Sequence, residues 1–565
     1  MARPLTCEPS LSLDRVTTPL IAPQWQRALS HHPDRAFARY ILKGLTEGFR
    51  TGHRTANPLR SATGNMPSAS QHPEVIDEYL RSELSLGRML GPFSLDQVPP
   101  HTHVHRMGLT PKGHNTGKWR LITDLSYPRG ASVNDGIDPR LCSLSYTSVD
   151  DVARRVSAMG IGTLMAKTDI ASAYRIIPVH PEDRVLQAIQ WRGSTYIDPM
   201  LPFGLRSAPK IFSAVADAFA WHLHQIGIPD VDHYLDDFIV LGPPLSPLCQ
   251  QYLHQLQTEC SLLGIPLAAH KTEGPTTCLT FLGIEIDSVA ARLRLPADKL
   301  ERLTLLLHEW AFKRSCLQKE LESLIGLLNH ACKVIRPGRS FLRRMLDLLH
   351  TTCHPPRGVV PIRLNKGFQS DLAWWLTFTE AWNGTSLLAT PFHMPHATMT
   401  SDASGSWGCG AWYLRSWFQI TWDYRSSALT IAEKEFLPII LACATWGRSW
   451  HGHRVTCRCD NQVVVASLRS RTSRSRGIMH LLRCLTFVEA HYHMHIDSIY
   501  IDTHSNHLAD DLSRNRLSSF LLKVPHADTF PSQVSLPLMD LLLDQQADWT
   551  SRVWRTQFSS IFSRD

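Results

Sequence analysis

The stretch from His233 to Gly242, HYLDDFIVLG, decides how this sequence is interpreted. Two adjacent acids, Asp236 and Asp237, lie between apolar residues on both sides, and this pattern predicts a tight β-hairpin with the acids at its turn. Neighbouring carboxylates repel each other, so the arrangement is costly unless cations bind there. The alternative, for the two acids taken alone, is an ordinary solvated turn.

Length and composition limit the number of domains and the class of protein. The chain has 565 residues, a length that suggests about three or four domains. Its hydrophobic fraction of 43% excludes a mainly disordered protein, and its net charge of +8 permits a polyanionic partner. We expect no membrane-spanning helix, because no long apolar run occurs. Scattered cysteines and the absence of a visible signal peptide predict reduced thiols in an intracellular protein, either cytoplasmic or nuclear.

The pattern along the chain predicts a multidomain α+β protein. Short β-like runs such as WRLIT, LMAKTDI, RIIPV and YIDPM alternate with helical segments, and a new α/β pattern begins near residue 396. Apolar spacing predicts one amphipathic helix within residues 24–50. We expect five parts: a lead with a linker (1–73), a mixed domain (74–290), a helical segment (291–395), an α/β domain (396–516) and a tail (517–565).

Further motifs accompany the paired acids in a fixed order. A strand-like segment with two cations, KWRLITDL, could meet phosphates, and Asp169 ends an apolar strand five residues before Tyr174. A Pro/Gly turn, LPFGLRSAP, then leads into a helical run. After the acids follow GIP, KT and FLGI.

These ordered motifs resemble a reverse transcriptase over about residues 75–350. The resemblance implies a right-hand polymerase with fingers and palm over 74–290, followed by a helical thumb and connection over 291–395. It also implies that Asp169, Asp236 and Asp237 are catalytic acids. They would hold two divalent ions, Mg²⁺ or Mn²⁺, for nucleotidyl transfer.

The same resemblance implies substrate contacts. Lys118 and Arg120 would hold the triphosphate of a dNTP, and an exposed charge is the alternative for Lys118 and for Lys271. Tyr174 corresponds to the steric gate that excludes ribonucleotides. The remaining positions are Phe203 in the nucleotide pocket, Lys271 near the leaving pyrophosphate, and Phe281 with Gly283 in the primer grip. Ordinary core packing is the alternative for the two phenylalanines.

A second set of acids lies in the C-terminal part. Asp402 ends one strand-like run and Asp460 ends another, while Thr430 and Glu433 have the spacing of a capping box that would start a helix. Pro438 should kink that helix or shift its start.

This order of strands, helices and acids resembles ribonuclease H over residues 396–516. The resemblance implies a two-ion site that hydrolyses RNA paired to DNA, built from Asp402, Glu435, Asp460 and Asp510. Glu435 is preferred to Glu433 because it immediately precedes the apolar run FLPII. Asp510 is preferred to Asp511 from the reading A-D-x-L-S-R. His504 and His507 are candidates for a catalytic histidine.

Two kinds of smaller signal leave alternatives open. Arginines gather in two places, where either a solvated surface or contact with a nucleic-acid backbone would explain them: Arg336, Arg339, Arg343 and Arg344, and Arg469, Arg471, Arg474 and Arg476. The histidine runs HTHVH and HYHMH are better explained as strand faces than as metal sites.

Motif content also suggests the kind of genetic element. No D-[ST]-G protease motif or zinc-binding integrase pattern is present, and the polymerase segments most resemble DIRS-type retrotransposons, with Ty3-type LTR elements as the rival. The implied partners are an RNA template, a DNA primer, an RNA–DNA hybrid, dNTPs and a separately encoded recombinase, with no membrane. The alternative function is an inactive or domesticated copy that only binds nucleic acid.

Overall fold

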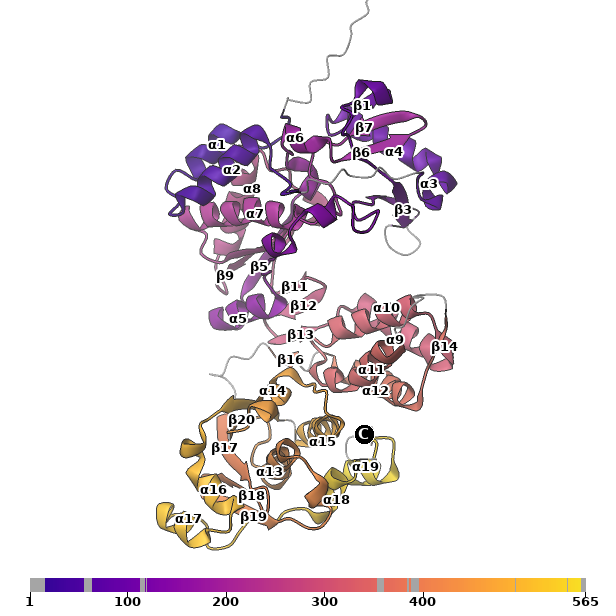
Figure 1. The fold of residues 1–565 in the computed structure, drawn as a ribbon. Helices are drawn as coiled ribbons and strands as arrows, with labels where there is room; N and C mark the ends of the chain where they lie inside the picture. Colours follow the sequence, from indigo (N-terminus) through magenta and orange to yellow (C-terminus); the bar gives the residue numbers. More distant parts are fainter. Residues whose placement is uncertain are drawn as a thin grey trace, which may run out of the picture. The chain divides into compact units, whose positions relative to one another are not determined.

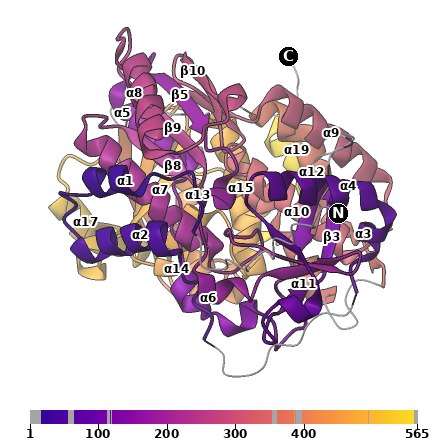
Figure 2. The ribbon, with the colours of Figure 1, turned by 90° about the horizontal axis from the view of Figure 1, so that it is seen from above.

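The computed structural model describes residues 16–54, 64–111, 117, 119–352, 360–383, 386–387, 396–492, 494–545 and 547–559. The chain divides into two compact units, Met1–Leu282 and Gly283–Asp565. Each unit combines helices and strands, which confirms the multidomain α+β class (Figures 1 and 2). No described helix is both long and apolar enough to cross a membrane.

The central sheet of the first unit has four strands. Their order is β10 (Glu273–Thr276), β5 (Leu164–Asp169), β9 (Asp237–Gly242) and β8 (Val231–Tyr234). Helices α7 (Ala208–Gln225) and α8 (Leu248–Leu263) contact strands of this sheet. Because β9 is an inner strand, Phe238, Ile239, Val240 and Leu241 are all buried, which explains its unbroken apolar run. The predicted hairpin at the paired acids is confirmed as β8 and β9.

A smaller part of the first unit carries the remaining strands. One sheet has the order β1 (Leu90–Phe93), β7 (Ser194–Ile197), β6 (Ala188–Trp191) and β2 (Val104–His105). A separate antiparallel pair joins β3 (Met107–Pro111) and β4 (Trp119–Thr123). The other elements of the first unit are α3 (Pro67–Gln71), α4 (Pro73–Ser85), α5 (Val149–Met159), α6 (Pro181–Arg184) and β11 (Cys278–Phe281).

Two sequence predictions in the first unit are wrong. The helix expected within residues 24–50 is two helices, α1 (Ala22–Ala28) and α2 (Arg35–Glu47). The Asp34 carboxylate accepts the backbone N–H groups of Ala36 and Phe37, so it caps a new helix where one continuous helix was expected. The run RIIPV is not a strand, because residues 173–176 form a 3₁₀ turn.

The second unit begins with helices and short strands. Strands β12 (Ile284–Asp287), β13 (Arg292–Arg294) and β16 (Ser386–Leu387) form one sheet, and β14 (Ser315–Cys316) pairs with β15 (Ile362–Arg363). The helices expected here are α9 (Ala297–Phe312), α10 (Gln318–Ala331), α11 (Arg343–Thr352) and α12 (Lys366–Trp382).

The C-terminal part contains a five-stranded mixed sheet. Its order is β19 (Ser416–Thr421), β18 (Gly408–Tyr413), β17 (His396–Ala403), β20 (Arg454–Cys459) and β21 (His495–Tyr500). The first three strands are antiparallel, whereas β17, β20 and β21 run parallel. The accompanying helices are α13 (Ile431–Trp446), α14 (Gln462–Ser470), α15 (Arg476–Tyr492) and α16 (His507–Ser513).

Helix α13 is buried along most of its length. The predicted capping box is present, because Thr430 and Glu433 exchange side-chain and backbone hydrogen bonds. Pro438 lies inside the helix and is buried, and the helix continues through it to Trp446, so the helix start is not shifted.

The segment after residue 516 is folded, although the sequence suggested a tail. It contains α17 (Leu517–Lys523), α18 (Leu536–Leu543) and α19 (Arg552–Gln557). Trp554 is 1% exposed, and its ring centroid lies 4.9 Å from that of Phe487 in α15. Apolar residues spaced for short helices, rather than the prolines between them, therefore determine the structure of this segment.

Candidate active sites

The pairing of β5 with β9 brings three acids of the first unit together. Asp169 and Asp237 are direct partners across this antiparallel pair. Asp236 lies in the turn before β9, where Leu235 has a φ of +54°. The backbone carbonyl of Asp236 accepts the Ile170 N–H at 3.0 Å. Acids separated by 67 positions in the sequence, Asp169 and Asp236, therefore meet at one edge of the sheet.

These carboxyl groups perturb each other. Burial, together with the charge of Asp169, raises the pKa of Asp236. Burial and the charge of Asp236 raise the pKa of Asp237 to about 6. Raised values of this kind mean that the charged forms are unfavourable without a compensating cation. The oxygen donors fit a hard divalent ion such as Mg²⁺.

A lysine supplies part of the compensation. Lys271 Nζ lies 2.8 Å from Asp169 Oδ2, and this hydrogen bond raises the pKa of the lysine. The backbone also links the two segments, because the Ala268 N–H donates to the Asp169 carbonyl at 2.8 Å. About half of the Lys271 side chain is exposed, so the amine can also face a ligand.

Two aromatic rings lie close together: Tyr174 follows β5, and Phe203 lies between β7 and α7. The ring centroids of Tyr174 and Phe203 are 5.1 Å apart, and those of Tyr174 and Phe212 are 5.3 Å apart. Phe203 is 47% exposed, which excludes the core-packing alternative for that residue. Burial raises the pKa of Tyr174 to about 12, so its hydroxyl stays protonated at neutral pH. The turn is strained, because Ser172 has a φ of +64°.

A buried ion network supports the Tyr174 turn, and sequence reasoning missed it. Arg175 is 6% exposed, with Nη1 2.5 Å from Asp198 Oδ2 and Nη2 2.8 Å from Glu83 Oε2. Glu83 also pairs with Arg88 at 2.6 Å. Helix α4, the Tyr174 turn and the segment after β7 are thereby joined by charge-assisted hydrogen bonds.

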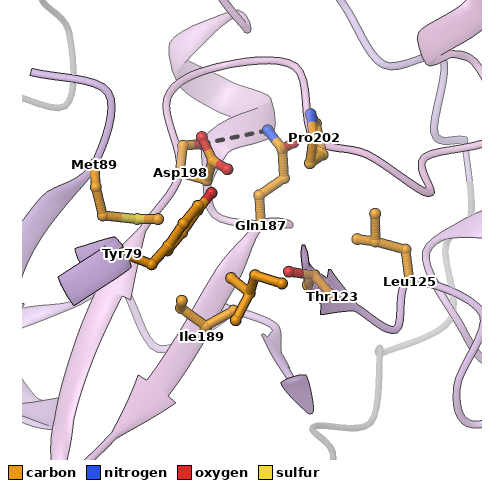
Figure 3. Close-up of a pocket in the computed structure, with 9 residues that line it drawn as sticks. Tyr79, Met89, Thr123, Leu125, Gln187, Ile189, Asp198 and Pro202 are labelled. Carbon is orange, nitrogen blue, oxygen red and sulfur yellow. Dashed lines mark hydrogen bonds between the residues drawn. The ribbon is translucent and has the colours of Figure 1, made fainter. Parts of the chain in front are cut away.

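A cavity of about 10 Å³ adjoins this network (Figure 3). Tyr79 and Gln187 line it, and Gln187 Nε2 donates to the Asp198 carbonyl at 3.5 Å. A space of this size holds at most about one water molecule. It therefore belongs to the supporting structure and is no nucleotide pocket.

The remaining predicted substrate residues have different positions. Lys118 lies outside the described residues. Arg120 is exposed on β4, opposite Thr110 of β3. Phe281 is buried at 1% exposure. Gly283 has a φ of +77°, which favours glycine.

The second unit gathers four acids around the end of β17. Asp402 is 4% exposed, and it accepts hydrogen bonds from the Ser513 hydroxyl and, at 3.2 Å, from Asn506 Nδ2. Burial raises the pKa of Asp402 to about 6, and the charges of Asp460 and Asp510 act in the same direction. Sequence reasoning assigned no role to Ser513 or Asn506, although Ser513 lies within the reading A-D-x-L-S-R, because their contacts with Asp402 depend on the fold.

Glu435 is the most perturbed of these acids. Burial, with the charges of Asp402 and Asp460, raises its pKa to about 9. Its Oε2 atom is buried and accepts no hydrogen bond from any described residue. A buried oxygen of this kind is costly unless it gains a partner, and a divalent ion would provide one.

Each preferred acid has different contacts from the nearby acid that was considered in its place. Glu433 Oε2 caps the helix by accepting the Thr430 N–H at 2.8 Å. Asp510 pairs with Arg514 at 2.5 Å, whereas Asp511 is buried and pairs with Lys523 at 2.6 Å. His504 belongs to a 3₁₀ turn and His507 begins α16, so the two candidate histidines have no shared element.

The arginine groups are divided between structural and exposed positions. Arg471 is half-buried and pairs with Glu489 at 2.6 Å, and Arg344 pairs with Asp548 at 3.0 Å. These ion pairs explain both arginines without contact with a nucleic-acid backbone. The exposed members are Arg336, Arg339, Arg469, Arg474 and Arg476. His493 of HYHMH lies outside the described residues, and no described group of three metal-ligating atoms includes the HTHVH histidines.

Comparison with known proteins identifies part of the chain. Residues 111–286 match the family model described as "Reverse transcriptase (RNA-dependent DNA polymerase)". These residues form a reverse transcriptase domain. The match contains the β5–β9 pair with Asp169, Asp236 and Asp237.

Two viral polyproteins resemble the chain beyond this domain. The Pro-Pol polyprotein of simian foamy virus type 1 is 26% identical over 305 residues, covering 50% of this chain and 22% of the relative. That of simian foamy virus type 3 (strain LK3) is 24% identical over 321 residues, covering 54% and 24%. The chain thus spans about a quarter of the length of these relatives. The reverse transcriptase domain is of the retroelement type, and neither relative decides between a DIRS-type and a Ty3-type element.

Solved structures of foamy viral protease-reverse transcriptase are also similar. The complex with dsDNA has a TM-score of 0.46 at 15% identity, covering 86% of this chain and 99% of that chain. The complex with an RNA/DNA hybrid has a TM-score of 0.48 at 14% identity, covering 87% and 64%.

Proposed function

We propose that this protein is an RNA-directed DNA polymerase with ribonuclease H activity, which copies retroelement RNA into DNA and degrades the RNA strand of the hybrid. The observation that carries the proposal is the position of Asp169 and Asp237 as direct partners within the reverse transcriptase domain. Three carboxylates at one edge of a sheet can hold divalent ions where a primer and a nucleotide would meet.

In the polymerase site, Asp169 and Asp236 would be the main metal ligands, and Asp237 would complete the acidic edge. Bound Mg²⁺ or Mn²⁺, two ions per site, would activate the primer 3′-hydroxyl and stabilise the leaving pyrophosphate. Lys271 holds Asp169 in place through its 2.8 Å contact and adds positive charge beside the departing phosphate.

The nucleotide would lie against the two aromatic rings. Tyr174 would exclude a ribose 2′-hydroxyl by steric contact, with Phe203 packed beside it at 5.1 Å. Arg120 and Lys118 would contact the triphosphate as charge-assisted donors. Phe281 and Gly283 would support the primer strand. The buried network around Arg175 keeps the tyrosine turn in position.

In the second unit, Asp402, Glu435, Asp460 and Asp510 would hold two ions that hydrolyse the RNA strand. The buried Glu435 oxygen without a described partner supports this role. The Ser513 and Asn506 side chains orient Asp402 toward the ligand position.

The partners follow from this chemistry. They are an RNA template, a DNA primer, an RNA–DNA hybrid and dNTPs, encountered inside the cell and without a membrane. We assign the chain to a DIRS-type element, which would add a separately encoded recombinase as a partner.

Primer extension on an RNA template tests the polymerase proposal. The purified full chain, with dNTPs and Mg²⁺ or Mn²⁺, should extend a DNA primer and should stop when EDTA removes the metal. A wild-type protein that binds the primer–template but never extends it would contradict the proposal and favour an inactive nucleic-acid-binding protein.

A further inference from the structure

A cysteine lies among the acids of the second unit. Strand β20 ends at Cys459, and Asp460 follows immediately. In the part of the chain that the structure describes, one group of three potential metal ligands has its atoms within 4.8 Å of one another: Glu435, Cys459 and Asp460. The thiol therefore lies beside two of the carboxylates that the proposed nuclease site uses.

The surroundings of this group favour a ligand. Cys459 is fully buried, and its sulfur accepts only the weak backbone N–H contact of Asn461, at 3.4 Å, among the described residues. The Glu435 side chain is 6% exposed, and its Oε2 atom has no described hydrogen-bond partner. The group therefore joins a sulfur and a second carboxylate to a buried glutamate that has an oxygen without a described partner.

The donor types determine which ion such a group would select. Oxygen ligands alone suit Mg²⁺, whereas a thiolate beside them favours Zn²⁺, Cd²⁺ or Co²⁺. Three protein ligands with one position left for water are typical of an open tetrahedral zinc site. On binding, the Cys459 thiol would release its proton to solvent and bind as thiolate, because a coordinating thiol is deprotonated by the metal.

We propose that Glu435, Cys459 and Asp460 form a site for a thiophilic divalent cation such as Zn²⁺, which competes with Mg²⁺ and inhibits the nuclease. The inhibitory part of the proposal rests on the ribonuclease H function proposed above. No described cysteine joins the polymerase acids in such a group. Low Zn²⁺ concentrations should therefore inhibit hybrid cleavage before they inhibit DNA synthesis.

Cobalt absorption spectroscopy on the full chain tests the site without any activity. Co²⁺ bound by a thiolate gives a sulfur-to-metal charge-transfer band, which should saturate at one equivalent in the wild type. Cys459→Ala should abolish this band. The matched control is Cys457→Ala, because Cys457 is equally buried two residues earlier on β20 and lies outside the three-ligand group. This control should keep the band.

A band that survives Cys459→Ala, or is absent from the wild type, would overturn the site. If Cys459→Ala fails to fold, Glu435→Gln provides a second variant, since it keeps the side-chain volume. It should weaken Co²⁺ binding by about tenfold or more, and unchanged binding would equally overturn the site.

Inhibition provides the functional measurement. With Mg²⁺ constant, the Zn²⁺ concentration that halves hybrid cleavage, relative to each variant's own rate, should rise about tenfold or more in Cys459→Ala. An unchanged value would overturn the inhibitory role. A wild type that does not cleave hybrids would contradict the ribonuclease H function itself, and the cobalt spectrum would still decide the metal site.

Discussion

The two carboxylate clusters are held in different ways. In the reverse transcriptase domain, a cation compensates Asp169, because Lys271 lies 2.8 Å away. In the second unit, neutral donors hold Asp402: the Ser513 hydroxyl and the Asn506 amide. Glu435 has an oxygen without a described partner and a pKa raised to about 9 by burial.

This difference indicates how strongly each cluster depends on bound metal. Lys271 already lowers the free-energy cost of ionising the polymerase acids, and its half-exposed amine can move when a substrate binds. The second cluster has no such partner for Glu435 among the described residues, so a divalent ion has more charge to compensate there. The clusters lie in separate compact units, and we expect each to act without the other.

The largest expected effect comes from the turn of the polymerase hairpin. Asp236→Asn should lower primer extension by roughly a thousandfold, because several kcal/mol of metal-based charge stabilisation are lost. Hybrid cleavage by the same preparation should stay near the wild-type rate. Gel analysis of extension and cleavage checks both, and loss of the two activities together would contradict independent sites.

The converse substitution tests the other cluster. Asp402→Asn should lower hybrid cleavage by roughly a thousandfold for the same reason, while primer extension continues. Ser513 and Asn506 can still hydrogen bond to the amide, so the variant should fold. Undiminished cleavage of an RNA–DNA hybrid by this variant would remove Asp402 from the site.

The buried network behind the tyrosine turn should matter for stability. Arg175→Met leaves the buried Asp198 without its cation and leaves Glu83 paired with Arg88 alone, which should destabilise the first unit by about 3–5 kcal/mol. The control is Arg81→Met, because Arg81 and its partner Glu78 are both 70% exposed, and a loss below about 1 kcal/mol is expected. Denaturant unfolding measures both, and equal losses would show that the network is no more important than a surface pair.

The smallest effect concerns nucleotide selection. Tyr174→Val should raise ribonucleotide incorporation relative to dNTPs by roughly tenfold to hundredfold, because adding or removing one small group in a binding pocket changes discrimination between substrates by about that factor. The kcat/KM ratio for matched nucleotides measures this change. Phe212→Leu is the control for altered packing of the tyrosine ring, because Phe212 is buried and its ring centroid lies 5.3 Å from that of Tyr174. This control should keep the wild-type selectivity. If selectivity is unchanged in Tyr174→Val, Tyr174 is not the gate.

Local patterns in the sequence predicted much of this structure. Apolar residues around Asp236 and Asp237 predicted the β8–β9 hairpin, and the spacing of Thr430 and Glu433 predicted the start of α13. These features depend on neighbours a few positions away, which is why the sequence reveals them.

Contacts between distant positions were not predictable in this way. Lys271 reaches Asp169 across 102 positions, and Arg175 reaches Glu83 across 92. The position of Cys459 beside Glu435 depends on the contact of α13 with β17 and on the pairing of β17 with β20. The burial of Trp554 depends on its contact with Phe487 of α15. Periodicity cannot show which distant groups a fold brings together.

The most direct measurement is a crystal structure of the full chain with Mn²⁺, an RNA–DNA hybrid and a dNTP behind a non-extendable primer end. Anomalous scattering locates the manganese ions. We expect peaks bounded by Asp169 and Asp236, and others bounded by Asp402, Glu435 and Asp460. Ions bound elsewhere, with these carboxylates remaining free, would contradict it.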